Sequence, residues 1–310
     1  MNTVACTLFD GSYHFGVGAL ANSLFAHGYR GIFWVGYRGK LPIWAETAIK
    51  HAGWSEYCVC DSFSLGFIRL DTDWHFTNYK PQFMQSLLNT HCCEAHGVVY
   101  FDPDIVIKCR WSFYEQWTSY GAGIVQEVIQ NVMPSDSPNR RAWAPLINDL
   151  NLKVIRNIDS CFNGGFCAVS RDNIKFIILW EKIINGIFKM YRLNPSIFLP
   201  GNGIAPFNGV DQDALNIAAM CYEGELSTMG PEAMDFWPAG MVMSHATGSS
   251  KPWNKKFIWM SLKGYPPTRA ERGYWQHVHA PISLQSKINI RLKLLSIQIA
   301  AFIGRFYSRN

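Results

Sequence analysis

The chain has 310 residues, of which 48% are hydrophobic and 16% charged, with 28 Lys plus Arg against 23 Asp plus Glu. This length and composition predict one large globular domain, or two smaller ones, and exclude a disordered or collagen-like chain. The formal net charge of +5 belongs to the C-terminal segment, because residues 283–310 contain five basic residues and no acidic one. These five are Lys287, Arg291, Lys293, Arg305 and Arg309. The remaining body is formally neutral, which argues against a nucleic-acid-binding protein, since such a protein needs a broad basic face.

The nine cysteines form no C-x-x-C pair, so the sequence offers neither a zinc ribbon nor a thioredoxin motif. Several of them lie in apolar runs, and we expect reduced thiols in a cytoplasmic protein. The N-terminal residues show no secretory signal pattern, and no run of 18 apolar residues predicts a membrane-spanning helix.

In chain order, the first hundred residues alternate between apolar strand-like runs and helix-like spacing. We expect strands at residues 1–9, 31–36, 57–60 and 97–101, and helices at residues 13–27, 42–53 and 80–91. Asp10-Gly11-Ser12 can turn the chain between the first strand and the first helix.

The second part of the chain continues the alternation around two polar loops. We expect a strand at residues 166–170, helices at 173–192 and 211–221, and loops at 134–145 and 194–210. Strands that alternate with helices predict an α/β domain with a largely parallel sheet.

Residues 16–21 fit the dinucleotide-binding pattern G-x-G-x-x-A, but their context does not support that reading. The glycines lie inside the predicted helix, and the next strand is followed by Arg38 and Lys40 where the pattern expects an acid. Glycines that allow close helix packing are the better interpretation.

Asp102-Pro103-Asp104 follows the apolar strand 97–101, at the kind of position where open α/β sheets bind ligands. Two carboxylates separated by one residue can face a divalent cation such as Mg²⁺ or Mn²⁺, which would bridge a diphosphate and neutralise a leaving group. An acidic turn closed by Pro103 is the alternative reading of these three residues.

Residues 245–253 (HATGSSKPW) combine several side chains suited to a bound phosphate. His245 can complete the coordination of Mn²⁺, Gly248 lets the backbone approach a phosphate, and Lys251 supplies a point charge. A lone histidine is commonly a hydrogen-bonded structural residue, so the joint spacing carries the prediction rather than His245 alone.

In this order, the motifs of residues 3–255 resemble the retaining nucleotide-sugar glycosyltransferases of family 8, which include glycogenin and bacterial lipopolysaccharide galactosyltransferases. The most specific matches are D-Q-D-x-L-N at residues 211–216 and H-x-x-G-x-x-K-P-W at residues 245–253. The resemblance implies a GT-A type, Rossmann-like nucleotide-diphospho-sugar transferase domain with a mixed, mostly parallel sheet.

The resemblance also implies which residues bind a UDP-sugar donor. The backbone near Leu8 and Phe9 would contact the uracil, and Tyr13 would stack on it. Lys80 lies where the family places a basic residue ahead of its D-x-D strand.

The family's metal and phosphate residues match the motifs already described. Asp102, Asp104 and His245 would hold Mn²⁺ or Mg²⁺, with Asp102 also contacting the donor, and Gly248 and Lys251 would face its phosphates. The family commonly has a small residue between the two aspartates, so Pro103 is a departure from its pattern.

Around the donor sugar, residues 162–166 (FNGGF) are similar to the family's F-N-x-G strand entry, with Asn163, Gly164 and Gly165 along the sugar. Asp211 and Asn163 suit hydrogen bonds to sugar hydroxyls, and Gln212 can place its amide near the anomeric carbon. Because a neutral amide is a poor nucleophile, we expect same-face substitution, in which the departing phosphate oxygen takes the acceptor proton.

The opposing interpretation is an inverting enzyme with a carboxylate base such as Asp213 or Glu127. A second alternative, of a different class, is a non-catalytic sugar-nucleotide or glycan-binding protein on the same fold. The complete D-x-D and H-x-x-G-x-x-K-P-W motifs favour an enzyme.

The tail predicts a basic amphipathic helix. Its apolar residues recur every three or four positions and are Ile288, Leu292, Leu295, Ile299, Phe302, Ile303 and Phe306. Such a helix suits an anionic membrane surface, although a helix packed onto the body is the alternative.

We therefore predict a catalytic domain over residues 1–280 and a membrane-associating helix over residues 281–310, with the protein peripheral on the inner face of the cell membrane. The function expected is transfer of a hexose from a UDP-sugar to a cell-surface or lipid-linked glycan of the lipopolysaccharide or capsule type. The loop at residues 265–275, with Arg269 and Arg272, could border the acceptor.

Overall fold

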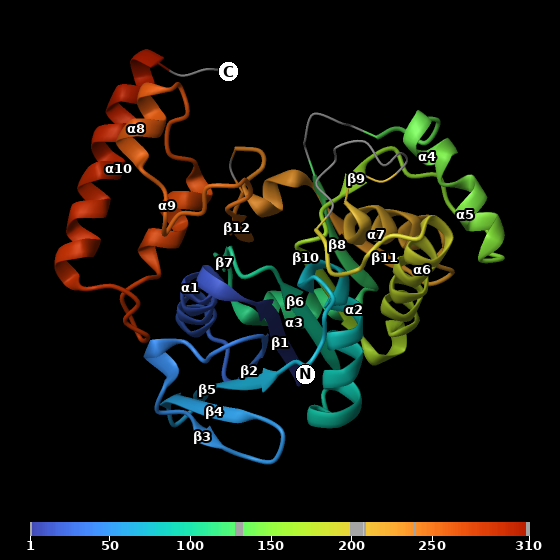
Figure 1. Cartoon of the computed structure of the whole chain (residues 1–310), viewed down its shortest axis with the longest axis horizontal. Coiled ribbons are helices and arrows are strands. Elements are labelled where there is room, and N and C mark those ends of the chain that lie inside the picture. Colours follow the sequence, from blue (N-terminus) through green and yellow to red (C-terminus); the bar gives the residue numbers. More distant parts are fainter. Residues whose placement is uncertain (1, 128–132, 199–206, 208, 239, 308–310) are drawn as a thin grey trace. The chain divides into compact units, whose positions relative to one another are not determined.

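The structure, a computed structural model, describes residues 2–127, 133–198, 207, 209–238 and 240–307 (Figure 1). The chain divides into two compact units. The first unit comprises the described residues of Met1–Leu8, Leu70–Phe101 and Ser112–Pro231. The second comprises those of Phe9–Arg69, Asp102–Trp111 and Glu232–Asn310.

The first unit is built on a mixed sheet in the order β11-β8-β10-β6-β1, with the short strand β9 also paired to β8. The strands are β1 (Thr3–Phe9), β6 (Gly97–Phe101), β8 (Ala122–Glu127), β9 (Cys161–Phe162), β10 (Phe166–Ser170) and β11 (Leu226–Met229). β6 runs parallel to β1 and antiparallel to β10, and every residue of its sequence GVVYF is buried. A continuous apolar run of this kind is typical of a strand covered on both faces.

The helices of the first unit supply the rest of its core. They are α2 (Phe76–Ser86), continued by a π-helical turn (Leu87–His91), α3 (Trp111–Ser119), α4 (Pro138–Ala142), α5 (Ala144–Asp149), α6 (Lys175–Tyr191) and α7 (Val210–Cys221), with a 3₁₀ turn at Arg171–Asn173. α6 lies beside α7 (Figure 1) and buries Phe176, Trp180, Ile183 and Ile187 at helical spacing.

The second unit contains four further strands and a separate two-stranded sheet. β2 (Gly31–Tyr37), β5 (Phe63–Arg69), β4 (Ser55–Cys60) and β3 (Ile49–Lys50) lie in that order, and β7 (Ile105–Ile107) pairs antiparallel with β12 (Met243–His245). We call this second pair the β7–β12 ribbon. Short 3₁₀ turns occur at Gly11–Tyr13, Ile43–Ala45 and Pro231–Met234.

The helices of the second unit are α1 (His14–Ala26), α8 (Phe257–Leu262), α9 (Arg269–Gln276) and α10 (Lys287–Tyr307). The glycines of the G-x-G-x-x-A pattern lie within α1, which packs closely against its neighbours. A Cβ on Gly16 would lie 2.1 Å from the carbonyl oxygen of Pro103, and one on Gly18 would lie 2.3 Å from Leu284 Cδ2. Because only glycine fits at these two positions, the pattern serves helix packing.

α10 is two-faced. Ile297 and Ala300 are buried where α10 lies beside α8 (Figure 1), and Ser261 Oγ donates a hydrogen bond to the Ala300 carbonyl at 2.7 Å. The predicted apolar stripe lies largely on the other face, where Leu292 and Phe302 are each 59% exposed. One face of the helix therefore packs on α8, as the alternative reading of the tail expects, while membrane association of the exposed stripe stays a prediction. Arg309 lies outside the described residues, and no helix among the described residues is long and apolar enough to span a membrane.

The predicted α/β fold class with a mixed sheet is confirmed, and the strands at 97–101 and 166–170 match β6 and β10. The helix predicted at residues 42–53 is wrong, because Ile43 and Ile49 are exposed and the segment instead pairs β3 with β4 at the sheet edge. The loop predicted at residues 134–145 is also wrong. There Ser137 caps α4 by accepting a hydrogen bond from the Arg140 amide, and Pro138 takes the first helical position.

The sequence did not predict the strand β5, although five of its seven residues are buried. Most of the loop predicted at 194–210 lies outside the described residues. The division of the chain at residue 281 stays a prediction.

Candidate functional site

Two aspartates and a histidine meet at the β7–β12 ribbon in the second unit. Asp104 directly precedes β7, and His245 ends β12, where the register pairs it with Ile105. His245 Nε2 lies 3.3 Å from Asp104 Oδ1 and 3.9 Å from Asp102 Oδ2. One ligand atom from each residue lies within 4.8 Å of the others, so the three can share one cation. We call these three residues the cation cluster.

Lys251 adds a charged side chain beside the cation cluster. Its Nζ lies 2.6 Å from Asp104 Oδ2, and its pKa is raised because Asp104 outweighs the effect of burial, which acts to lower it. Burial acts to raise the pKa of the Asp104 carboxyl, but His245 and Lys251 outweigh it and hold that pKa well below its usual value. Asp104 is therefore a stable carboxylate between two basic groups.

The ligand atoms of the cation cluster fit a hard or borderline divalent cation. Two carboxylates and an imidazole nitrogen are ligands that Mn²⁺ accepts, and Mg²⁺ accepts the oxygen atoms among them. The Nδ1 atom of His245 is buried without a hydrogen-bond partner among the described residues, so the ring makes its polar contacts through Nε2. An imidazole nitrogen facing two carboxylates is most stable when a positive charge lies between them.

Aromatic rings support the lysine end of this cluster. The Tyr13 ring lies edge-on to Trp253 at 5.4 Å, and Lys251 Nζ lies 5.7 Å from the Tyr13 centroid. Burial raises the pKa of Tyr13, which stays a neutral phenol. Gly248 has a φ of +99° with open space around it, which leaves the backbone accessible. The structure thus brings Tyr13 and the residues of the H-x-x-G-x-x-K-P-W segment near the two aspartates.

The first unit contains a second polar cluster, centred on the start of α7. Lys80, 2% exposed on its side chain, donates from Nζ to Asp211 Oδ2 and to the Gly164 carbonyl, at 2.9 Å each. The lysine and aspartate form a buried ion pair that fixes the Asn163–Gly165 turn next to α7.

Glu127, at the end of β8, connects the remaining residues of this polar cluster. Its Oε2 accepts a hydrogen bond from Gln212 Nε2 at 2.5 Å, and its Oε1 accepts one from Asn163 Nδ2 at 3.0 Å. Gln212 Oε1 in turn accepts the Gly164 amide at 3.1 Å. Both ends of the Gln212 amide are thereby fixed, and so is its orientation.

Sequence reasoning considered Glu127 only as an alternative base and missed its place between Asn163 and Gln212. The available signal was an acid at the end of an apolar strand, which is where α/β sheets collect functional side chains. The other residues of D-Q-D-x-L-N are structural: Asp213 accepts the Gly209 amide, and Asn216 brackets the backbone of Phe162.

A cysteine thiol adjoins this polar cluster, with Cys161 Sγ 3.8 Å from Gln212 Nε2. Burial, followed by the nearby Glu127, raises its pKa to about 12. A thiol protonated at neutral pH is a poor nucleophile, so the arrangement does not suggest cysteine catalysis.

The structure therefore groups the predicted site residues into two sets, one in each unit. Tyr13, Asp102, Asp104, His245 and Lys251 gather in the second unit, and Gly248 is on the same segment. Lys80, Asn163, Gly164, Asp211 and Gln212 gather in the first, and Gly165 adjoins them by donating to Asn163 Oδ1. Leu8 and Phe9, at the end of β1, are both buried.

Comparison with known proteins supports the fold assignment. The chain is similar to the apo structure of WbbM, a bifunctional glycosyltransferase, with a TM-score of 0.54 and 14% sequence identity. The similarity covers 93% of this chain, which spans about half (51%) of the WbbM chain. No protein-family model and no curated protein sequence matches. The chain thus has an α/β fold shared with a glycosyltransferase, and its assignment to family 8 stays a prediction.

Proposed function

We propose that this protein is a retaining glycosyltransferase that transfers a hexose from a UDP-sugar to a cell-surface or lipid-linked glycan, of the lipopolysaccharide or capsule type. The observation that carries the proposal is the cation cluster, with Lys251 bound to Asp104, in a chain whose fold is similar to that of a glycosyltransferase. A sugar nucleotide carries concentrated negative charge on its diphosphate, and this set of side chains suits that charge.

In this function Asp102, Asp104 and His245 would hold Mn²⁺ or Mg²⁺. The bound cation would neutralise charge on the diphosphate as the sugar leaves. Lys251 would add a mobile ammonium on the same phosphates, exchanging its contact with Asp104 for one with the donor. Tyr13 would offer its ring to the uracil, and the backbone of Leu8 and Phe9 would contact its edge.

The polar cluster of the first unit would bind the sugar. Asp211 and Asn163 suit hydrogen bonds to hydroxyl groups, and Lys80 would act through the Asp211 carboxylate and the Gly164 carbonyl that it holds. Because Glu127 and the Gly164 amide fix the Gln212 amide, that amide is preorganised for a developing positive charge at the anomeric carbon.

The reaction proposed is same-face substitution. The acceptor hydroxyl forms the new bond to the anomeric carbon while the bond from that carbon to the phosphate oxygen breaks, and the departing phosphate oxygen takes the hydroxyl proton. No protein base is needed, and the configuration at the anomeric carbon is retained. An inverted product would overturn this mechanism and favour a base such as Glu127.

The exposed stripe of α10 supports a peripheral place on the inner membrane surface. Exposed Lys287, Arg291 and Arg305 flank it, and the helix has no acidic residue. Each basic residue close to an anionic surface contributes on the order of 1 kcal/mol, and the exposed apolar side chains add to this.

A donor-hydrolysis screen tests the function. The protein is incubated with individual UDP-sugars, with and without Mn²⁺, and release of UDP and the configuration of the released or transferred sugar are measured. We expect cation-dependent turnover of one donor, loss of at least about 10³-fold in Asp104→Ala, and little change in the exposed control Asp61→Ala. Cation-dependent binding without turnover would instead identify a non-catalytic sugar-nucleotide-binding protein.

A further inference from the structure

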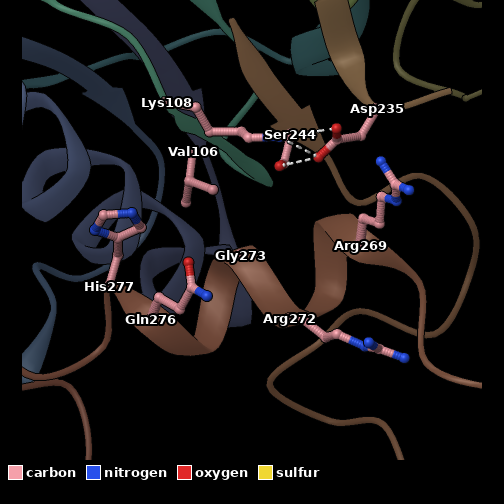
Figure 2. Close-up of a pocket in the computed structure, with 9 residues that line it drawn as sticks. All are labelled: Val106, Lys108, Asp235, Ser244, Arg269, Arg272, Gly273, Gln276 and His277. Atoms are coloured by element: carbon pink, nitrogen blue, oxygen red, sulfur yellow. Dashed lines mark hydrogen bonds and ion pairs between the residues drawn. The ribbon is translucent and has the colours of Figure 1, made fainter. Parts of the chain in front are cut away.

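A cavity of about 250 Å³ lies in the second unit, bordered by the β7–β12 ribbon and α9 (Figure 2). Val106 and Ser244, a register pair of the ribbon, form part of one wall. Ser244 directly precedes His245, and successive side chains of a strand point to opposite faces. The cavity and the cation cluster therefore lie on different faces of the ribbon.

One face of α9 forms the opposing wall. Arg269, Gly273 and Gln276 are separated by four and three positions and so lie along one side of the helix, as Figure 2 shows. A Cβ on Gly273 would lie 3.2 Å from Ser244 Oγ and 3.4 Å from Val106 Cγ2. The absence of a side chain at this position lets α9 approach the ribbon.

The acidic residue of the cavity is already neutralised. Lys108 Nζ donates to both Asp235 oxygens, at 2.9 and 3.0 Å, and to the Gly240 carbonyl at 2.6 Å. Ser244 Oγ donates a further hydrogen bond to Asp235, whose side chain is 1% exposed. Because of this ion pair, the negative charge of Asp235, the acid in the cavity lining, is compensated.

Two donors on the α9 wall are solvent-exposed and lack protein partners among the described residues. The side chains of Arg269 and Gln276 form no hydrogen bond or ion pair with any residue that the structure describes, and Figure 2 shows both extending from α9 on the side of the ribbon. Arg272 points away from them and makes a weak 3.4 Å contact with the Pro267 carbonyl. Burial, followed by the nearby His27, lowers the pKa of His277 to about 4, so this ring adds a neutral polar group at pH 7.

We propose that this cavity is a second anion site, which binds a phosphate ester through the guanidinium of Arg269 and the amide of Gln276. Guanidinium offers a planar set of N–H donors that matches phosphate oxygens, and the amide offers two more. The volume is several times the roughly 30 Å³ occupied by one water molecule, so it can also hold the sugar or glycerol that the phosphate esterifies.

The binding site is independent of the proposed function. Within that function it would hold a phosphate group of the acceptor, and only this assignment depends on glycosyl transfer. Phosphate esters reach the site from two sources, a phosphorylated sugar or a phospholipid headgroup, which share the same chemistry.

The test is an NMR titration of the ¹⁵N-labelled full chain with glucose 1-phosphate, glycerol 3-phosphate and neutral glucose. We expect the Gly273 and Gln276 amide signals to move saturably with at least one ester and not with glucose. Arg269→Gln should weaken that binding about tenfold, since one charge-assisted contact is lost, and Arg269→Lys should restore part of it. Gly273→Val, which fills the wall, should abolish it.

Two controls separate this site from the donor phosphates. Lys251→Ala should leave the Gly273 shift unchanged, and Arg269→Gln should leave Mn²⁺-dependent UDP binding unchanged. The tighter of the two esters identifies the source of the phosphate. Equal titration of the wild type and Arg269→Gln, or no saturable shift with either ester, would overturn the proposal, whatever the donor screen shows.

Discussion

Each unit contains one lysine–aspartate pair at its functional cluster, and the two pairs differ in what else they contact. Lys80 in the first unit is 2% exposed on its side chain and donates to Asp211 and to a backbone carbonyl. Lys251 in the second unit is 14% exposed, and its partner Asp104 also faces His245. The first pair is enclosed and holds a turn against a helix, whereas the second places a partly exposed lysine beside a candidate cation site. In the proposed function the first pair would hold the sugar-binding residues in place, and the second would bind the cation and the donor phosphates.

Removing each lysine in turn tests this difference most strongly. Lys80→Met leaves Asp211 buried without its cation, and we expect the free energy of unfolding to fall by about 3–5 kcal/mol. Lys251→Met leaves Asp104 beside His245, and we expect a much smaller loss of stability together with a large loss of UDP affinity. Urea unfolding and nucleotide titration measure both quantities. Equal destabilisation by the two variants would show that the pairs play the same role.

Acid should weaken the second unit through His277. The pKa of this histidine is lowered to about 4 in the folded state, first by burial and then by His27, against about 6.5 in the unfolded chain. The folded state therefore binds fewer protons between these values, so stability is complete above pH 6.5 and falls as the pH decreases toward 4. The loss reaches about 3 kcal/mol at most.

Urea unfolding between pH 7 and pH 4 measures this loss. His277→Gln should flatten the dependence over that window, and the exposed neighbour His279 supplies the control His279→Gln. If His279→Gln flattens the curve equally, the assignment to His277 is wrong.

In the first unit, Glu127→Gln tests whether the carboxylate positions Gln212. The substitution preserves size but removes the charge that accepts from both amides, so Gln212 and Asn163 lose their fixed orientation. We expect kcat for donor turnover to fall by about 10- to 100-fold with KM little changed. A pH–rate profile separates positioning from base catalysis, because loss of a base would also remove the acidic limb of the profile.

The smallest effect on stability is expected on the exposed face of α10. Leu295→Ser and Phe302→Ser alter side chains that are 52% and 59% exposed, so unfolding should change by less than about 0.5 kcal/mol each. Together they should reduce binding to anionic vesicles several-fold, as measured by co-sedimentation. Unchanged vesicle binding would leave this face without its proposed membrane contact.

The sequence predicted elements best where burial was continuous. GVVYF at residues 97–101 is apolar throughout and became the central strand β6, and the helix predicted at residues 173–192 became α6. Segments 42–53 and 134–145 were misassigned because edge pairing and a serine cap, rather than apolar periodicity, determine their structure.

At the candidate site, the sequence alone indicated Asp102, Asp104 and His245, since a D-x-D after a buried strand and a separate histidine segment carry recognisable chemistry. Their approach to within ligand distance depends on the pairing of β7 with β12, which joins segments about 140 residues apart. The role of Glu127 between Asn163 and Gln212 and the unpartnered Arg269 beside the ribbon emerged only from the tertiary structure. Local spacing determines which residues share a strand or a helix face. Long-range strand pairing decides which charged side chains come close together, and ligand binding depends on that proximity.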